Sequence, residues 1–237
     1  RAARVEGNLR EEIVARPERD DWYASKTPEL EGIEVPMLVC GSFSDHSLHT
    51  RGSFEAFRRT SSAQRWLYTH RDGKWSHYYS AQASRTRLQF FDHVLKGADN
   101  GWAERSPVRI AVHEAGPEPV AVTLESAWPP ADLTWETLYL DAAEQTLTDQ
   151  VPSSSVAAAF RTHRGTASFS WTVPEDLDVI GHLAARLHVE VRDCDDVHLF
   201  VGVRKLRGDE EVTFEGSFGF AYDMVSKGWQ RAAHREL

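Results

Sequence analysis

The first hundred residues alternate between short apolar runs and a helical pattern. Met37 to Cys40 form an apolar run without polar alternation, which is typical of a strand buried on both faces of a parallel sheet. Thr50 to Arg59 then carry Phe54 and Phe57 at helical spacing. Arg65 to Thr69 have the composition of a second strand. The pattern predicts a strand–helix–strand unit, long enough for the crossover that parallel pairing requires.

A second helix is predicted after Ser80. The residue type at Ser80 suits a helix N-cap, and Leu88, Phe91 and Leu95 recur at helical spacing. Gly97 is a typical helix stop. The first part of the chain is therefore expected to have an α/β fold.

Beyond residue 107 the helical signal fades. Ala98 to Pro107 is polar and contains Asn-Gly and proline, so we interpret it as a linker. Short alternating segments separated by Pro, Gly and Asp turns follow it, and they indicate an all-β antiparallel sandwich. The segments are 108–112, 137–140, 167–173, 185–191, 198–203 and 212–214.

Two polar side chains follow the predicted parallel strands. Asp45 comes after the first strand in a Gly/Ser turn, and His70 comes directly after the second. Loops at the carboxyl ends of parallel strands carry the chemistry of α/β sheets, so we expect both residues to face one crevice. An acid and then a histidine is the second half of the α/β-hydrolase order Ser…Asp/Glu…His.

Composition narrows the range of functions. The formal charge of −9 argues against nucleic acid, whose binding depends on Lys and Arg neutralising phosphates. No apolar segment approaches the roughly 20 residues that span a bilayer, so we expect no membrane partner. The first residues lack the apolar core of a signal peptide, which favours a cytoplasmic location. Cys40 and Cys194 are the only cysteines, and Cys40 is expected to be a small core residue.

Short local motifs carry a family resemblance over nearly the whole chain. The motifs are Ile33-Glu34-Val35-Pro36, Ser44-Asp45-His46, Leu48-His49-Thr50-Arg51-Gly52-Ser53-Phe54, Leu67-Tyr68-Thr69-His70, Lys74-Trp75, Phe90-Phe91-Asp92-His93-Val94-Leu95-Lys96-Gly97, Trp128-Pro129, Leu138-Tyr139-Leu140 and Gly228-Trp229-Gln230-Arg231. Together they resemble the cocaine-esterase/X-prolyl dipeptidyl-peptidase (CocE/NonD) family of serine acyl hydrolases.

The resemblance implies a domain organisation and a reaction. It implies that residues 1–100 are the last strands and helices of an α/β-hydrolase domain. Residues 106–237 would be a truncated jelly-roll, galactose-binding-like β-sandwich. Asp45 and His70 would be the acid and histidine of the triad, with no cofactor. The substrate would be a small ester, amide or peptide, and the resemblance leaves open a homo-oligomer.

The histidine of the triad has an alternative in His77. Trp75-Ser76-His77 matches a Trp-x-His that follows the last strand in some family members, whereas His70 directly follows the strand here. We therefore favour His70. Asp45 together with His46 and His49 also raises a metal site, but nothing downstream completes a recognised spacing, so no metal is expected.

The nucleophile is missing from the sequence. No Gly-x-Ser-x-Gly occurs, and Gly41-Ser42, Gly52-Ser53 and Gly216-Ser217 each place the serine one position early. We expect the chain to be an internal or C-terminal portion of a longer hydrolase and to be inactive alone, because the acid and histidine have nothing to activate. Three functions remain open: a serine acyl hydrolase, an X-Pro dipeptidyl-peptidase of the same fold, and a non-catalytic carbohydrate- or partner-binding module.

Overall fold

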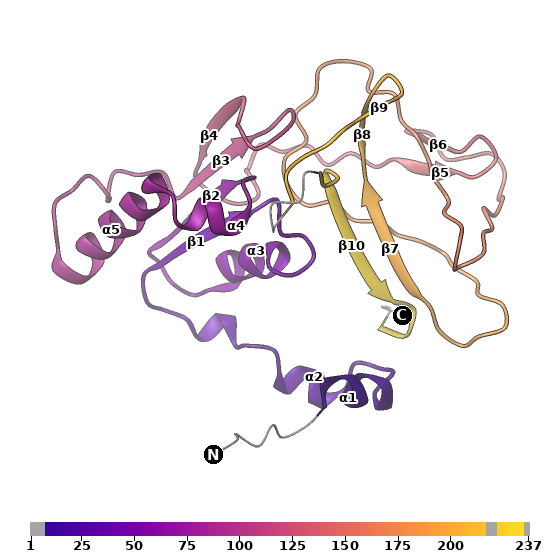
Figure 1. Ribbon diagram of the computed structural model, residues 1–237, viewed down its shortest axis with the longest axis horizontal. Helices are drawn as coiled ribbons and strands as arrows, with labels where there is room; N and C mark the ends of the chain where they lie inside the picture. Colours follow the sequence, from indigo (N-terminus) through magenta and orange to yellow (C-terminus); the bar gives the residue numbers. More distant parts are fainter. Residues whose placement is uncertain (1–7, 217–221, 235–237) are drawn as a thin grey trace. The chain divides into compact units, whose positions relative to one another are not determined.

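The computed structural model describes residues 8–216 and 222–234 (Figure 1). The chain forms two compact units, one of Pro129–His182 and the other of the described residues on either side of it. The helices are α1 (Leu9–Ala15), α2 (Asp21–Ser25), η1 (Leu30–Gly32), α3 (Thr50–Arg59), α4 (Lys74–Tyr78), α5 (Ala81–Lys96) and η2 (Ala232–His234). The strands are β1 (Met37–Ser42), β2 (Arg65–His70), β3 (Val108–Val112), β4 (Ala121–Glu125), β5 (Tyr139–Asp141), β6 (Thr146–Thr148), β7 (His198–Val203), β8 (Lys205–Arg207), β9 (Glu210–Val212) and β10 (Ser226–Arg231).

A four-stranded mixed sheet forms the centre of the larger unit, in the order β1-β2-β3-β4. β1 and β2 are parallel, with Ser42 opposite His70 at their ends, and α3 connects them. The predicted strand–helix–strand unit is therefore confirmed. The chain has the expected mixture of helices and sheets.

The strand at Val108–Val112 lies in a different sheet from the one we predicted. We placed it in a sandwich after a linker, but β3 pairs in parallel with β2 and antiparallel with β4. Trp102 provides the physical reason, because it is buried against Trp66 and Phe90 and so holds the preceding connection onto the sheet. The division into domains at 1–100 and 106–237 stays a prediction.

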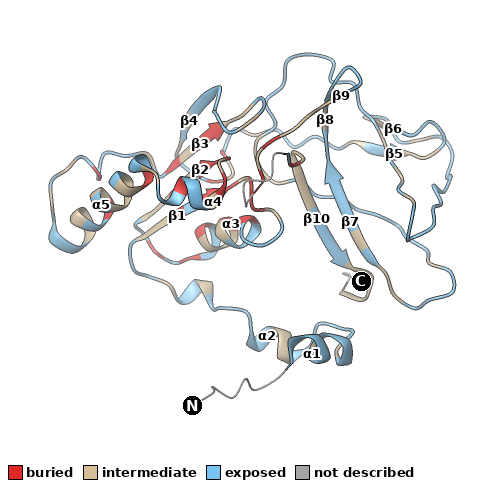
Figure 2. Cartoon of the chain, viewed as in Figure 1, coloured by how far each residue is buried: buried red, intermediate tan, exposed pale blue. Residues whose placement is uncertain are grey.

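The core lies on the two faces of this sheet (Figure 2). α3 buries Phe54 and Phe57 against β1 and β2, as its helical spacing predicted. Ser80 is the N-cap of α5 and its side chain accepts the Ala83 N–H, while Gly97 is the C-cap in the left-handed conformation, φ 67°. Both caps were predicted from the sequence.

The later strands form two-stranded antiparallel pairs. β7 pairs with β10 and β8 with β9, and β5 with β6 in the smaller unit. The predicted strands at 167–173 and 185–191 are not formed, apart from an isolated bridge between Thr146 and Ser170. Trp171 and Val189 in those segments are exposed, so their alternating apolar side chains lack the packing that favours a strand.

No helix within residues 8–216 and 222–234 is long and apolar enough to cross a membrane.

Candidate active site

Asp45 and His70 lie at one edge of the sheet, as predicted. β1 and β2 end side by side, and hydrogen bonds then join the loops that follow them. The Phe43 N–H donates to the His70 carbonyl at 2.8 Å, and the Ser44 hydroxyl donates to the Arg71 carbonyl at 2.5 Å. The Asp45 carbonyl accepts the N–H groups of Leu48, His49 and Thr50, which lead into α3. The backbone therefore holds the acid loop against the histidine loop.

Both residues line a pocket of about 310 Å³. Its walls come from β1, β2, α3, α4 and α5, and they include Cys40, Asp45, Ser53, His70, Lys74 and His77. The pocket brings together carboxylate, imidazole, ammonium and thiol groups. Such a convergence of polar groups in a concave site is what a ligand or substrate site requires.

The Asp45 carboxylate is buried, with 2 % of the residue exposed. Its Oδ2 accepts a hydrogen bond from Lys74 Nζ at 3.3 Å and lies 3.9 Å from His49 Nε2. Its Oδ1 is buried and has no hydrogen-bond partner. One oxygen of the carboxylate is thus compensated by a cation, while the other is left to accept a hydrogen bond.

His70 is also buried, and its ring stacks on His77 with centroids 3.6 Å apart and planes 4° from parallel. Burial, together with repulsion from His77, lowers the pKa of His70 to about 3. The ring is therefore neutral at pH 7. Its Nδ1 is buried and makes no hydrogen bond.

The acid–histidine hydrogen bond in this region joins Asp72 and His77, between Oδ2 and Nδ1 at 2.8 Å. We expected an Asp45 oxygen within about 3 Å of a ring nitrogen of His70, and no such bond occurs in the described residues. The physical reason is that Lys74 binds the Asp45 carboxylate and His77 stacks on His70. The sequence predicts a turn over residues 71–74, because Asp72 and Gly73 are turn-forming residues, and it does not mark Asp72 as the partner of a histidine.

The histidines next to Asp45 do not gather into a metal site. His49 is largely exposed, with 58 % of its side chain accessible. His46 lies near other charged groups, namely Arg71, Asp223 and Lys227. Burial, and then the charge of Arg71, lowers the pKa of His46 to about 4. Among the described residues the one group of three potential metal ligands is instead Cys40, His70 and His77.

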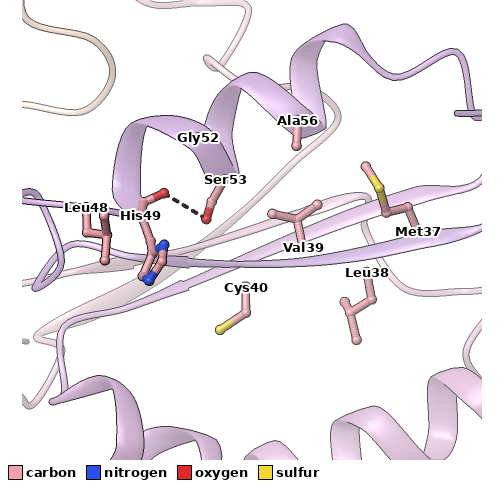
Figure 3. A pocket seen from close by; sticks show the side chains of 9 residues that line it. All are labelled: Met37, Leu38, Val39, Cys40, Leu48, His49, Gly52, Ser53 and Ala56. Carbon is pink, nitrogen blue, oxygen red and sulfur yellow. Dashed lines mark hydrogen bonds between the residues drawn. The ribbon is translucent and has the colours of Figure 1, made fainter. Parts of the chain in front are cut away.

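Cys40 and Ser53 are the other nucleophile types in the pocket. Figure 3 shows a second pocket, which Cys40 and Ser53 also line, and there Cys40 lies on the side of β1 opposite to Val39 and α3. Cys40 is an exposed residue, not the core residue expected from the sequence, because its side chain points away from Val39 and the core beneath α3. Desolvation of the thiol, partly offset by Tyr68, raises its pKa to about 11, so the thiolate is scarce at pH 7. The Ser53 hydroxyl donates to the His49 carbonyl at 3.1 Å within α3 (Figure 3), and it does not sit on a strand-to-helix elbow. Ser217 lies outside the described residues.

A match to a known family shows which family the chain belongs to. The family described as "X-Pro dipeptidyl-peptidase C-terminal non-catalytic domain" matches residues 100–237. The chain belongs to this family. No curated protein matches the chain.

Solved structures extend the relationship to the rest of the chain. Two crystal structures of a CocE/NonD family hydrolase from Staphylococcus aureus, one of them at 1.95 Å, each resemble it with a TM-score of 0.85 and 28% sequence identity. The similarity covers 98% of this chain but 42% of theirs, so the chain spans about two-fifths of the length of that hydrolase. The recognition made from the sequence motifs is confirmed. Asp45 and His70 precede residue 100, so the family description "non-catalytic" applies to residues that follow them.

Proposed function

We propose that this chain is part of a serine acyl hydrolase and supplies the acid Asp45 and the histidine His70. The nucleophilic serine would come from a segment outside this sequence, since no Gly-x-Ser-x-Gly occurs in it. His70 would take the serine proton as the hydroxyl attacks an ester or amide carbonyl, and would then return that proton to the leaving group. The first step releases the alcohol or amine and leaves an acyl-enzyme, and water then hydrolyses the acyl-enzyme to the free acid and restores the serine.

The observation that carries this proposal is a pair of unsatisfied polar atoms. Asp45 Oδ1 and His70 Nδ1 are both buried, both without a hydrogen-bond partner, and both belong to residues that line one pocket. Leaving such atoms unpaired costs about 1–3 kcal/mol each. A triad joins an acid oxygen to Nδ1–H of its histidine, and that bond would satisfy both atoms at once.

The neutral state of His70 fits the role. A general base must be unprotonated before the reaction, and burial keeps the pKa of His70 well below its usual range. Formation of the bond to Asp45 would stabilise the imidazolium that develops during catalysis and would raise that pKa toward a useful value. Lys74 would have to share or release the carboxylate.

The finer family features belong to the same proposal. The part of residues 106–237 that follows β4 would contribute a jelly-roll, galactose-binding-like domain, and the substrate would be a small ester, amide or peptide handled without a cofactor in the cytoplasm. An X-Pro dipeptidyl-peptidase is the second candidate, because the matching family bears that name. A non-catalytic binding module is the third, because the same description calls residues 100–237 non-catalytic.

The test uses a polypeptide that joins this chain to a segment carrying the nucleophilic serine. Turnover of a short-chain aryl ester and of a fluorogenic X-Pro amide separates the first two candidates. We expect His70→Gln and Asp45→Asn each to lower kcat by roughly 10³–10⁴-fold, as in other triads. His77→Gln is the matched control and should retain activity. Loss of activity in His77→Gln, with His70→Gln active, would assign the base to His77. Glycan binding without hydrolysis would favour the binding module.

A further inference from the structure

Three metal-ligand side chains converge on the face of the sheet that carries the pocket. Cys40 from β1, His70 at the end of β2 and His77 from α4 each offer one ligand atom, and these atoms lie within 4.8 Å of one another. Cys40 and His70 share this face because Cys40 is paired with Tyr68 in the parallel ladder and His70 is two residues further along the same strand.

We propose that Cys40, His70 and His77 form a binding site for a soft divalent cation of the Zn²⁺ class. One thiolate and two imidazoles are a ligand set that zinc prefers, and three protein ligands leave a fourth position open. This proposal departs from the sequence-based expectation of no metal, which considered only His46 and His49 beside Asp45.

The two histidines show the burial and the unsatisfied atoms that a ligand site requires. His70 is 7 % exposed and His77 is 9 % exposed. His70 Nδ1 and His77 Nε2 are both buried and have no hydrogen-bond partner. Buried polar atoms are normally paired, and a cation held together with Cys40 would give these two rings a common partner. For His70 Nδ1 this cation is the alternative to a bond with Asp45.

Asp72 supplies the outer support typical of such a site. Its Oδ2 lies 2.8 Å from His77 Nδ1. When a carboxylate accepts the proton of one ring nitrogen, the lone pair of the other nitrogen is directed to the metal, and metal-binding histidines almost always have such a partner. The arrangement Asp72–His77 therefore leaves Nε2 as the ligand atom.

Binding requires a small rearrangement. Zinc bonds of about 2.0–2.3 Å place tetrahedral ligand atoms roughly 3.5 Å apart, so the three side chains must move inward by about an ångström. A metal lies in the plane of the imidazole that binds it, so His70 and His77 must tilt out of their parallel stack. The thiol proton of Cys40 is released to solvent as the metal–sulfur bond forms.

The site does not depend on the hydrolase role. If both proposals hold, the cation and Asp45 compete for His70, and the metal would inhibit hydrolysis. The test therefore measures binding on the 237-residue chain itself, with no activity assay, so that its failure and that of the proposed function are distinguishable.

The experiment is a titration of the reduced chain with Co²⁺, followed by displacement with Zn²⁺. We expect one equivalent of Co²⁺ to produce a thiolate-to-metal charge-transfer band, and Zn²⁺ to abolish it. Cys40→Ser should lose the band. Cys194→Ser, which alters the other free cysteine, should keep it. His77→Gln should weaken binding at least tenfold, whereas His188→Gln, at an exposed position, should leave it unchanged.

A further variant separates coordination from folding. Asp72→Asn retains all three ligands and should weaken Zn²⁺ affinity about 10–100-fold in a chelator competition, while circular dichroism reports whether the fold is intact. A chain that binds no Co²⁺ or Zn²⁺ would overturn the proposal. So would a charge-transfer band that survives in Cys40→Ser or disappears in Cys194→Ser.

Discussion

The region from β1 to Trp128 and the region that follows it differ in how they bury apolar side chains. Within the described residues, the buried apolar side chains all belong to the first region except Phe214. In the second region Trp135, Phe200 and Trp229 are each at least half exposed. The chain thus has one well-packed core and a long stretch whose apolar side chains remain accessible.

The difference follows from the number of layers. In the first region, α3 contacts β1 and β2, and Phe90 of α5 packs edge-on against Trp66 of β2, so helices cover a four-stranded sheet. The described strands of the second region pair only two by two. A two-stranded hairpin is marginally stable in water, and burial of an apolar face needs a further strand or a helix. Stability should therefore be concentrated in the first region.

The largest expected effect comes from a matched pair of tryptophans. Trp102 is 1 % exposed and packs edge-on against Trp66 and Phe90, whereas Trp135 is 65 % exposed. Trp102→Ala should lower the free energy of unfolding by about 3–5 kcal/mol. Trp135→Ala should change it by less than about 0.5 kcal/mol. Urea denaturation followed by circular dichroism measures both. Equal losses would show that the two regions are equally packed.

The sequence predicted the first region better because its signals are local. The cap at Ser80, the stop at Gly97 and the helical spacing of Phe54 and Phe57 each depend on neighbours within a few residues, and the structure confirms all of them. The alternation around Trp171 also predicted a strand. It gave no information on the partner that a strand requires, and no strand formed there beyond the bridge at Ser170.

For the candidate site, too, the sequence predicted some features and not others. The position of Asp45 and His70 at one sheet edge followed from strand order, since parallel strands end together. The Asp72–His77 bond and the approach of Cys40 depend on side-chain directions across β1, β2 and α4, which spacing alone does not specify. A histidine five residues after a turn aspartate was the one available signal for Asp72.

Substitution of Arg71 tests how much the contact between the two regions contributes to stability. It is buried, its Nη2 donates to the carbonyls of Met224 and Val225 at 2.8 and 3.0 Å, and its guanidinium lies 3.7 Å from the centroid of the Phe214 ring. Arg71→Met leaves these carbonyls without their donor and should cost about 2–3 kcal/mol.

Arg71→Lys serves as the control for charge. It keeps the cation but loses the planar group that stacks on Phe214, so it should recover only part of the stability. The measurement is the thermal midpoint of both variants. An unchanged midpoint in Arg71→Met would mean that the C-terminal strands contribute nothing to the core.

The pH dependence of stability provides a second test of this contact, because the pKa of His46 responds to Arg71, Asp223 and Lys227. Burial, then Arg71, lowers its pKa to about 4, while Asp223 acts in the opposite direction and Lys227 in the same one. Between about pH 6.5 and pH 4 the unfolded chain binds a proton that the folded chain does not, so stability falls as the pH falls through this window. The expected loss from His46 is about 1 kcal/mol between roughly pH 7 and pH 5.5.

Urea denaturation at a series of pH values in the presence of a chelator measures this loss. His46→Gln should make the dependence shallower by that amount, and His70 should maintain the remaining slope because its pKa is lowered as well. His188→Gln, at an exposed position, should leave the slope unchanged. A His46→Gln profile that overlays the wild-type profile would contradict a half-buried, neutral His46.

The smallest expected effects concern two glycines of the well-packed region, whose replacement by alanine should change the free energy of unfolding in opposite directions. Gly97 ends α5 at φ 67°, where alanine has to adopt the left-handed conformation, so Gly97→Ala should lower stability by about 1 kcal/mol although nothing lies within 4 Å of the added Cβ. Gly52 lies inside α3, again with nothing within 4 Å of an added Cβ. Gly52→Ala should raise stability by roughly 0.5–1 kcal/mol, because glycine loses more conformational entropy than alanine in a helix.

Gly208, at φ 62° between β8 and β9, extends this comparison to the less packed region. The strain of Gly208→Ala should be similar to that of Gly97→Ala because the two φ angles are similar. A hairpin outside the core can open locally and relieve this strain, so the global unfolding midpoint should shift less. If Gly208→Ala shifts the midpoint as much as Gly97→Ala, the hairpin unfolds together with the core, and the two regions do not differ in stability.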